Sequence, residues 1–588
     1  MIPELLEFSA LRAAYAAGTL TPEALVRALY ARIAAYPDKA VFISLVPEAE
    51  AVSAARALTN EDLPLYGIPF VVKDNIDVAG MPTTAACPAF AYTPAADATC
   101  VAKLKAAGAI LLGKANLDQF ATGLNGTRSP YGAPRSALNA DYVSGGSSSG
   151  SGVAVGAALA AFSLGTDTAG SGRVPAAFNN VIGLKPSIGR ISPAGVVPAC
   201  KSLDCVAVFA NSAADAMAVL RVAEGFDEAD AYSRPPREIV LPASPKLGVL
   251  APQDRDMPAE NAALYVAAIG KAQALGWEIT EIDYAPLREI ASLLYGGAFV
   301  AERLAAIREF FAAHEEAVHP VVRQIIGGAT RFSAADAFAD IYKVQTLRHR
   351  ALAELAKCDA LLLPTAPTIF TVAEMLEQPI KHNATLGLYT NFVNLLDLAA
   401  VALPAGFTPA GLPFGVSFIG PAFSEASLCG YAAALHAGLG AGAGSRKLLP
   451  RSGYTAPQPE EFTLVVAGAH LSGMVLNHEL TALGARLVAA TSTAPDYKLF
   501  ALATTPAKPG LARAPGFAGA GIAVEVWALT PEAFARFTAA LPAPMGIGRV
   551  TLADGTAHPG FLCEAYALDG AADITSHGGW RAYLASRH

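Results

Sequence analysis

A stretch of small residues at positions 143–156, VSGGSSSGSGVAVG, constrains this chain most, because its five serines and five glycines lead directly into an apolar segment. Flexible linkers often have this composition, but they are seldom followed at once by an apolar run inside a domain. A phosphate-binding loop needs a lysine beside its glycines, and the next lysine here is Lys185. The stretch therefore predicts a tight loop that leads into a buried apolar helix over residues 153–165, with serines available for chemistry.

Length and composition restrict the class of protein. A chain of 588 residues is long enough for two or more domains with large cores. Hydrophobic residues make up 53% and charged residues 16%, yet no apolar run reaches the roughly 18 residues that a membrane-spanning helix needs. The net charge of -8, without a run of lysine or arginine, argues against nucleic-acid binding. We therefore expect a small-molecule partner, with no nucleic acid and no membrane.

The N-terminus and the cysteines indicate the compartment. The opening MIPELLEFSALRAAY has acidic residues where a secretory signal carries basic ones, so export is not expected. The seven cysteines are scattered and form no CxxC pair, which argues against a disulfide framework and against a zinc cluster. We expect reduced thiols, a cytoplasmic protein and no metal site.

Hydrophobic periodicity predicts an α/β fold. Helices are expected between residues 5 and 36, with Thr21 as an N-cap and Pro22 in the first helical turn. YGIPFVVKD and AGAILLGKAN resemble short buried strands, and ATCVAKLKAAG before the second resembles a helix. AFSLGTD, after the apolar helix, resembles a further short strand. Strand, helix and strand in this order indicate a sheet with covered faces.

A segment rich in Gly, Pro and Ser at residues 438–461 marks a domain boundary. We predict a first domain at 1–445, a linker at 446–461 and a second domain at 462–588. The second domain has strand patterns of its own in FTLVVAGA, GIAVEVWAL and GRVTLADG.

A second loop of small residues, GTDTAGSGRVP at 165–175, places Ser171 where a carbonyl carbon can approach and where successive amides can bind an oxyanion. A serine needs a base, and the first histidine in the chain is His314. Lys73, after the apolar GIPFVV, is an alternative base, although a lysine at a strand end commonly reaches to the surface. Neutralising it at pH 7 costs roughly 4 to 5 kcal/mol, within the range that burial supplies.

Four blocks in this order, GIPFVVKDNIDVAGMPTT, GKANLDQFATG, GGSSSGS and GTDTAGSGRVPAAFNNVIGLKPSIGR, closely resemble the amidase signature family. The resemblance covers about residues 5–440 and implies a mixed central sheet covered by helices. It also implies a Ser-cisSer-Lys triad: Lys73 matches the base, Ser147 the serine with a cis peptide bond, and Ser171 the nucleophile, 24 residues later. Ser149 stands where many members have glycine, and Ser148 and Ser151 are expected to make structural hydrogen bonds.

The same resemblance assigns the surroundings of Ser171. The backbone amides of Thr168, Ala169 and Gly170, together with that of Ser171, are the expected oxyanion hole. We interpret Asp167 and Arg173 beside them as a structural ion pair.

LLYGGAFVAERLAAI resembles the allophanate hydrolase subgroup of this family, in which a tyrosine and an arginine at this spacing hold the substrate. Here they are Tyr295 and Arg303, which a single helix would place on one broad face. A guanidinium is a natural bidentate partner for the carboxylate of allophanate, whereas the alternative makes Arg303 an ordinary solvated charge. Gly123 is expected to offer a backbone contact in the same pocket.

The C-terminal segments AGAHLSGMVLNHEL, YKLFAL, PAKPGLAR and GFLCEAYALDGAADITSHGGWRAYL resemble the extra domain of allophanate hydrolases. That resemblance implies a smaller α+β domain related to gamma-glutamylcyclotransferase-like folds. His577 and His470 are candidates for decarboxylating N-carboxycarbamate there, and each is otherwise a structural histidine.

The resemblance therefore predicts hydrolysis of allophanate to N-carboxycarbamate and ammonia through an acyl-enzyme, in urea degradation and without a cofactor. It also implies a homodimer and an upstream urea carboxylase, which we expect in another chain because no biotin or ATP motif is found. The alternatives are an amidase for malonamate or a biuret-like amide, a non-catalytic binding subunit, and a nucleotide-binding protein.

Overall fold

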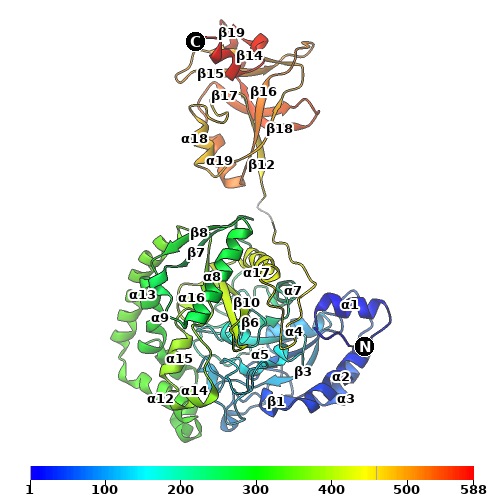
Figure 1. Ribbon diagram of the computed structural model, residues 1–588, viewed down its shortest axis with the longest axis vertical. Coiled ribbons are helices and arrows are strands. Elements are labelled where there is room, and N and C mark those ends of the chain that lie inside the picture. Colours follow the sequence, from blue (N-terminus) through cyan, green and yellow to red (C-terminus); the bar gives the residue numbers. More distant parts are fainter. Residues whose placement is uncertain (1, 458–459, 588) are drawn as a thin grey trace. The chain divides into compact units, whose positions relative to one another are not determined.

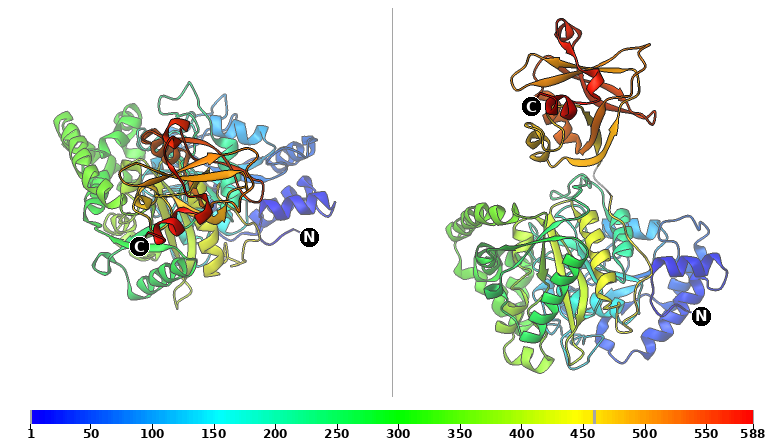
Figure 2. Two further views of the ribbon diagram at one scale, coloured as in Figure 1. Left: turned by 90° about the horizontal axis from the view of Figure 1, so that it is seen from above. Right: turned by 45° about the horizontal axis from the view of Figure 1, so that its top comes forward.

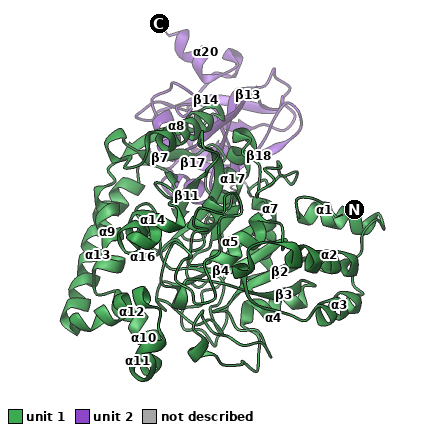
Figure 3. Cartoon of the chain, turned by 60° about the horizontal axis from the view of Figure 1, so that its bottom comes forward, with its two compact units in different colours: residues 1–458 green, residues 459–588 purple. Residues whose placement is uncertain are grey.

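The computed structural model describes residues 2–457 and 460–587, which form two compact units, residues 1–458 and 459–588 (Figure 3). The division falls inside the predicted linker, and two of its residues, 458 and 459, lie outside the described residues. The first part of that linker belongs to the first unit, because the backbone N–H groups of Arg451 and Ser452 donate hydrogen bonds to the buried carboxylate of Glu7.

The first unit is built on a mixed sheet. Its strands are β1 Phe42–Leu45, β2 Pro69–Lys73, β3 Ile110–Ala115, β4 Phe162–Asp167, β5 Ile182–Lys185, β6 Cys205–Ala210, β7 Lys246–Leu250, β8 Glu278–Ile282, β9 Ala360–Pro364, β10 Leu398–Phe407 and β11 Pro413–Pro421. In the described part of the chain these strands form one 11-stranded sheet in the order β1-β3-β2-β4-β6-β5-β10-β11-β9-β7-β8. Both parallel and antiparallel pairs occur, and the predicted mixed α/β class is confirmed.

Helices cover this sheet. They are α1 Phe8–Ala16, α2 Pro22–Ala35, α3 Glu48–Ala57, α4 Thr99–Ala106, α5 Ser149–Gly156, α6 Val174–Phe178, α7 Ala213–Ala223, α8 Ala259–Ala274, α9 Ala285–Gly296, α10 Val300–Ala306, α11 Arg308–His314, α12 Pro320–Gly327, α13 Ala334–Leu355, α14 Val372–Glu377, α15 Lys381–Leu386, α16 Phe392–Leu395 and α17 Glu425–Leu439. Within this unit α1, α2 and α3 lie on one side, and α9 and α13 lie on the opposite side (Figures 1 and 2). The predicted start of α2 is confirmed, because Thr21 Oγ1 accepts the N–H of Ala24 at 3.2 Å and Pro22 is the first helical residue.

The apolar segment after the serine-rich loop differs from the prediction. Helix α5 ends at Gly156, so the expected helix over 153–165 is wrong in its second half, whereas the strand expected from AFSLGTD is confirmed as β4, which begins at Phe162. The chain reverses at Ala158, which has φ 54°, and Ala161 then donates to Pro69 O. Because β4 lies between β2 and β6, hydrogen bonds from both neighbours outweigh the apolar helical pattern.

The strand arrangement brings distant residues to one place. β2 runs parallel to β4, with Val72 opposite Leu164, so the carboxyl ends of both strands meet at the same edge. Lys73 therefore ends β2 beside the last residues of β4, from which the second loop of small residues continues.

The second unit has its own elements and core. It comprises β12 Phe462–Val466, α18 Asn477–Thr481, β13 Arg486–Ser492, β14 Tyr497–Leu502, β15 Lys508–Arg513, β16 Ala523–Leu529, α19 Pro531–Ala539, β17 Met545–Thr551, β18 Ala557–Cys563, β19 Ala572–Asp573 and α20 Trp580–Ala585. Among its described residues the strands form a five-stranded sheet, β13-β16-β12-β18-β17, and a three-stranded sheet, β15-β14-β19. Leu464, Val526, Trp527 and Phe561 lie in a hydrophobic core confined to this unit.

Over residues 2–457 and 460–587, no single helix is long and apolar enough to cross a membrane. The segments Ala285–Ala306 and Arg308–Ala317 pass the length and composition test only as a pair, and they are bent by 82°.

Candidate active site

Lys73 is a buried amine at the end of β2. Its side chain is 0% exposed, and Nζ donates to Ser147 Oγ at 2.8 Å and to Thr166 Oγ1 at 2.7 Å. Burial lowers the pKa of Lys73 from 10.5 to about 7, against the opposing effect of the carboxylates of Asp118 and Asp204. A substantial part of the amine is therefore neutral near pH 7, which rules out the surface lysine considered from the sequence.

Ser147 links this amine to Ser171. The Gly146–Ser147 peptide bond is cis, as the family resemblance implies, and Ser147 O accepts the N–H of Asp118 at 3.0 Å. Ser147 Oγ donates to Ser171 Oγ at 2.9 Å. An unbroken chain of hydrogen bonds therefore runs from Ser171 through Ser147 to Lys73.

The remaining serines of the first loop hold it against the sheet. Ser148 Oγ accepts the N–H of Thr166 and donates to Thr166 O, while Ser151 Oγ donates to Leu164 O. Ser149 Oγ donates to Asn116 O at 3.2 Å. These bonds confirm a structural role for Ser148 and Ser151.

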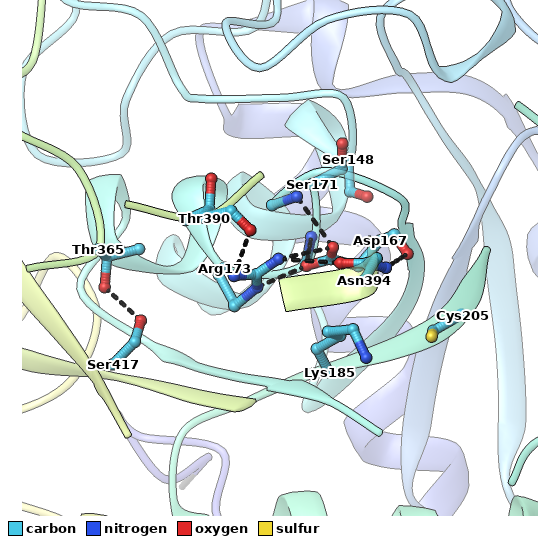
Figure 4. Close-up of polar contacts among 12 residues, drawn as sticks. Ser148, Asp167, Ser171, Arg173, Lys185, Cys205, Thr365, Thr390, Asn394 and Ser417 are labelled. Atoms are coloured by element: carbon cyan, nitrogen blue, oxygen red, sulfur yellow. Dashed lines mark hydrogen bonds and ion pairs between the residues drawn. The ribbon is translucent and has the colours of Figure 1, made fainter. Parts of the chain in front are cut away.

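The loop that carries Ser171 is fastened by a buried ion pair. Arg173 Nε and Nη2 donate to the two carboxylate oxygens of Asp167 at 2.9 and 3.0 Å, which confirms the predicted pair (Figure 4). Arg173 also donates to Thr390 O, and Asn394 Nδ2 donates to Asp167 O at 2.8 Å. The guanidinium of Arg173 holds the pKa of Asp167 below its usual value despite burial.

The predicted oxyanion donors are not equivalent. Gly170 N–H donates to Asp167 Oδ1 at 2.9 Å, so this amide is already engaged by the ion pair that holds the loop. Among the described residues, the amides of Thr168, Ala169 and Ser171 have no hydrogen-bond acceptor. They are the donors left for an oxyanion.

Tyr295 and Arg303 meet, although they lie on two helices and not on one. Helix α9 ends at Gly296 and α10 begins at Val300, because Asp340 accepts the N–H of Ala298 at 2.6 Å and occupies the space beside Gly297. The expectation of a single helix face is therefore wrong.

The contact between the two side chains forms across that break. Arg303 Nη2 donates to Tyr295 Oη at 3.2 Å, and the guanidinium lies 4.8 Å from the centroid of the tyrosine ring. Arg303 is 1% exposed, and in the described part of the chain its Nε has no partner. It is therefore not the solvated charge of the alternative interpretation, and its buried free donor suits a carboxylate.

Gly123 lies on the other side of Ser171. Its carbonyl accepts a long hydrogen bond from Ser171 Oγ at 3.4 Å, and a Cβ at this position would lie 2.4 Å from Asp118 Oδ2. Asp118 holds the Gly123 loop by accepting the N–H groups of Asn125, Gly126 and Arg128.

The sequence interpretation missed Asp118, Thr166 and Asp204. Asp118 had a signal, since it follows the strand pattern AGAILLGKAN, but Thr166 resembles an ordinary strand residue. Asp204 accepts a hydrogen bond from the hydroxyl of Thr168, which lies 36 residues away in the chain, so only the fold pairs them.

The two histidines of the second unit have different environments. His470 lines a cavity of about 620 Å³, where Nε2 is 2.9 Å from Glu479 Oε2 and the ring stacks on Phe561. His577 is exposed, packs edge-on against Tyr583 and does not line this cavity, in the part of the unit that the structure describes. The structure therefore does not bring both candidates to one site.

Over the described ranges, no cluster of three or more His, Cys, Asp or Glu side chains is arranged to hold a metal ion.

Comparisons with known proteins cover both units. Residues 24–429 match the family described as Amidase, and residues 462–585 match the Allophanate hydrolase C-terminal domain. The structure is similar to the allophanate hydrolase of Kluyveromyces lactis, with a TM-score of 0.75 and 40% identity, covering 97% of this chain and 98% of that one.

Two curated relatives differ in length. A urea amidolyase from Lachancea kluyveri is 44% identical over 575 residues, 93% of this chain and 31% of its own length. The chain thus spans about a third of the urea amidolyase that it matches. A glutamyl-tRNA(Gln) amidotransferase subunit from Deinococcus radiodurans is 35% identical over 71% of this chain and 94% of its own length.

Proposed function

This chain belongs to the amidase family, and we propose that within it the chain hydrolyses allophanate (urea-1-carboxylate) to N-carboxycarbamate and ammonia, in urea degradation. The observation that carries the proposal is the likeness over both units to an allophanate hydrolase, because the fold of the first unit alone does not choose among amides. The buried Tyr295 and Arg303 support the same substrate, since it carries a carboxylate.

The proposed mechanism begins with a proton relay. Hydroxyl protons rotate, so the network that runs from Lys73 to Ser171 can reverse: neutral Nζ accepts the proton of Ser147 while Ser147 Oγ takes the proton of Ser171. Ser171 Oγ then attacks the carbonyl carbon of the terminal amide. The low pKa of Lys73 supports this role, because an ammonium has no lone pair with which to accept the proton.

The tetrahedral intermediate places a negative charge on the former carbonyl oxygen. We assign its stabilisation to the free amides of Thr168, Ala169 and Ser171. The carbon–nitrogen bond then breaks, the proton returns through Ser147 to the departing nitrogen, and ammonia leaves an acyl-enzyme on Ser171. Water loses a proton to the same relay, attacks the acyl carbon and releases N-carboxycarbamate.

At the other end of the substrate we assign the carboxylate to Arg303, with Tyr295 orienting the guanidinium. Gly123 shapes the space between the two ends, because any larger residue would meet Asp118. The alternative substrates, malonamate and biuret-like amides, differ in this region: malonamate keeps the carboxylate, whereas biuret does not.

We extend the proposal to the reactions before and after this hydrolysis. A urea carboxylase would supply the substrate, which accords with the likeness to urea amidolyase. In the second unit we assign any decarboxylation of N-carboxycarbamate to His470, because it lines a cavity and His577 does not. A homodimer in the cytoplasm is expected from the family resemblance.

The test is ammonia release from allophanate, malonamate and biuret by the wild type, Ser171→Ala and Arg303→Gln. We expect Ser171→Ala to abolish release. Ser149→Ala is the matched control because, among the described residues, that hydroxyl donates only to the backbone carbonyl of Asn116. Arg303→Gln should raise KM for both carboxylated substrates. Absence of allophanate turnover by the wild type contradicts the proposed substrate, and full activity of Ser171→Ala contradicts the nucleophile.

A further inference from the structure

The first unit holds a cavity between α12, α15 and the end of α9. Its volume is about 200 Å³, and its lining includes Arg128, Tyr295, Gln324, Arg331 and Asn383. Among the described residues that line it there are two guanidinium groups and no carboxylate. Two cations without a carboxylate in the lining favour an anionic ligand.

Arg128 is the buried cation of this cavity. It is 1% exposed, and its Nη1 and Nη2 donate to the carbonyls of Thr122 and Pro379 at 2.9 and 2.8 Å. Its Nε has no hydrogen-bond partner in the described part of the chain. A buried donor without an acceptor is costly, and a ligand oxygen would satisfy it. The nearby carboxylate of Asp118 accepts the N–H groups of Asn125, Gly126 and Arg128 and, among the described residues, makes no hydrogen bond to this Nε.

The floor of the cavity adjoins the residues assigned to the substrate carboxylate. Tyr295 lines the cavity, and its hydroxyl accepts the hydrogen bond from Arg303. Thr122 connects the two arginines, since its carbonyl accepts from Arg128 and its hydroxyl from Arg303 at 3.2 Å. The next residue is Gly123, whose carbonyl faces Ser171.

The mouth of the cavity is marked by exposed residues. Arg331, at the end of the short 3-10 helix Gly328–Arg331, and Gln324 on α12 both line the cavity and are exposed. Two guanidinium groups thus line the cavity, those of exposed Arg331 and buried Arg128, and a third, that of Arg303, contacts the hydroxyl of Tyr295 in its lining.

We propose that this cavity is the anion-selective access site of the enzyme, in which Arg331 attracts small carboxylates from solvent and Arg128 binds them before they reach Arg303. The inference rests on the proposed function for its substrate, a carboxylated amide. The product would leave by the same route, because N-carboxycarbamate carries a second carboxylate. Arg331 and Arg128 thus select ligands by their negative charge before these ligands reach the reacting atoms.

The test uses Arg331→Gln in the full chain, since Arg331 is exposed and its replacement leaves the buried contacts intact. For allophanate we expect kcat/KM to fall about threefold to tenfold through KM, with kcat within about twofold. The dependence of kcat/KM on ionic strength should flatten. Arg331→Lys should restore both, and Arg350→Gln, which removes an exposed charge of α13 that does not line the cavity, should change neither.

Calorimetry separates this inference from the proposed substrate. Malonate is a stable dicarboxylate of the same shape as N-carboxycarbamate, and malonamide is its neutral counterpart. We expect Arg331→Gln and Arg128→Lys to weaken malonate binding about threefold or more and to leave malonamide unchanged.

Equal losses for malonate and malonamide, no malonate binding by the wild type, or an unchanged salt dependence of malonate binding in Arg331→Gln would overturn the access site. If the wild type binds malonate in the expected way but does not hydrolyse allophanate, the proposed substrate fails and the access site stands.

Discussion

The buried amine of Lys73 predicts that removing it stabilises the first unit at neutral pH while abolishing activity. Burial lowers the pKa of Lys73 from 10.5 to about 7. At about 1.4 kcal/mol per pKa unit, this shift lowers the free energy of unfolding of the wild type at pH 7 and below by roughly 5 kcal/mol, relative to pH values above 10.5. Lys73→Met keeps the length of the side chain and removes that cost. It also removes the hydrogen bonds to Ser147 and Thr166, each worth about 1 kcal/mol, so the net gain at pH 7 is about 3 kcal/mol.

The sign of the pH dependence follows from proton binding. Between pH 7 and 10.5 the unfolded chain holds a proton on Lys73 that the folded chain has released, so the stability of the wild type rises with pH. Lys73→Met lacks this group, and its advantage should shrink by about 1.4 kcal/mol per pH unit. The two proteins should be about equally stable near pH 9.

Urea unfolding at pH 7, 8 and 9 measures this difference. Trp277 reports on the first unit when Trp527 and Trp580, which lie in the second, are replaced by Phe in both proteins. A pH-independent difference, or a wild type more stable than the variant at pH 7, would refute the reasoning.

Lys114→Met is the matched control, because Lys114 is a buried lysine on the adjacent strand β3. Its Nζ lies 3.2 Å from Asp74 Oδ1 and donates to Thr83 and to Pro82 O. Replacing it leaves a buried carboxylate without its cation, so we expect a loss of about 3 to 5 kcal/mol where Lys73→Met gives a gain.

Three further predictions concern activity and the loops of the site. The kcat/KM for ammonia release should rise with pH and level off above an apparent pKa near 7, because neutral Lys73 is the active form; a flat profile from pH 6 to 8 would contradict this. Arg173→Gln should lower the free energy of unfolding in urea by about 3 to 5 kcal/mol, because Asp167 is left buried without its cation; a loss below about 1 kcal/mol would show that the pair is dispensable. Gly123→Ala should lower kcat tenfold or more, because its Cβ would meet Asp118 Oδ2 at 2.4 Å and shift the loop; a normal kcat would show that the loop yields without cost.

Much of the fold was predictable because local signals agree with the tertiary structure. Thr21 and Pro22 begin a helix in both, and the apolar runs ending at Lys73 and Ala115 are buried strands in both. Where neighbours in space compete with local pattern, prediction was wrong: the helix expected over 153–165 ends at Gly156, because β4 begins at Phe162 and pairs with a strand on each side.

The active site was also predictable only in part. By itself the sequence determined the identity of the groups, since Lys73, Ser147 and Ser171 stand in ordered motifs that resemble one family. The tertiary structure alone decided their chemistry. Lys73 and Ser147 are 74 residues apart in the chain yet 2.8 Å apart in space.

A pKa and a free hydrogen-bond donor depend on what surrounds a group, and those surroundings come from distant segments. For this reason the lowered pKa of Lys73, the engaged amide of Gly170 and the free Nε of Arg128 follow only from the folded chain.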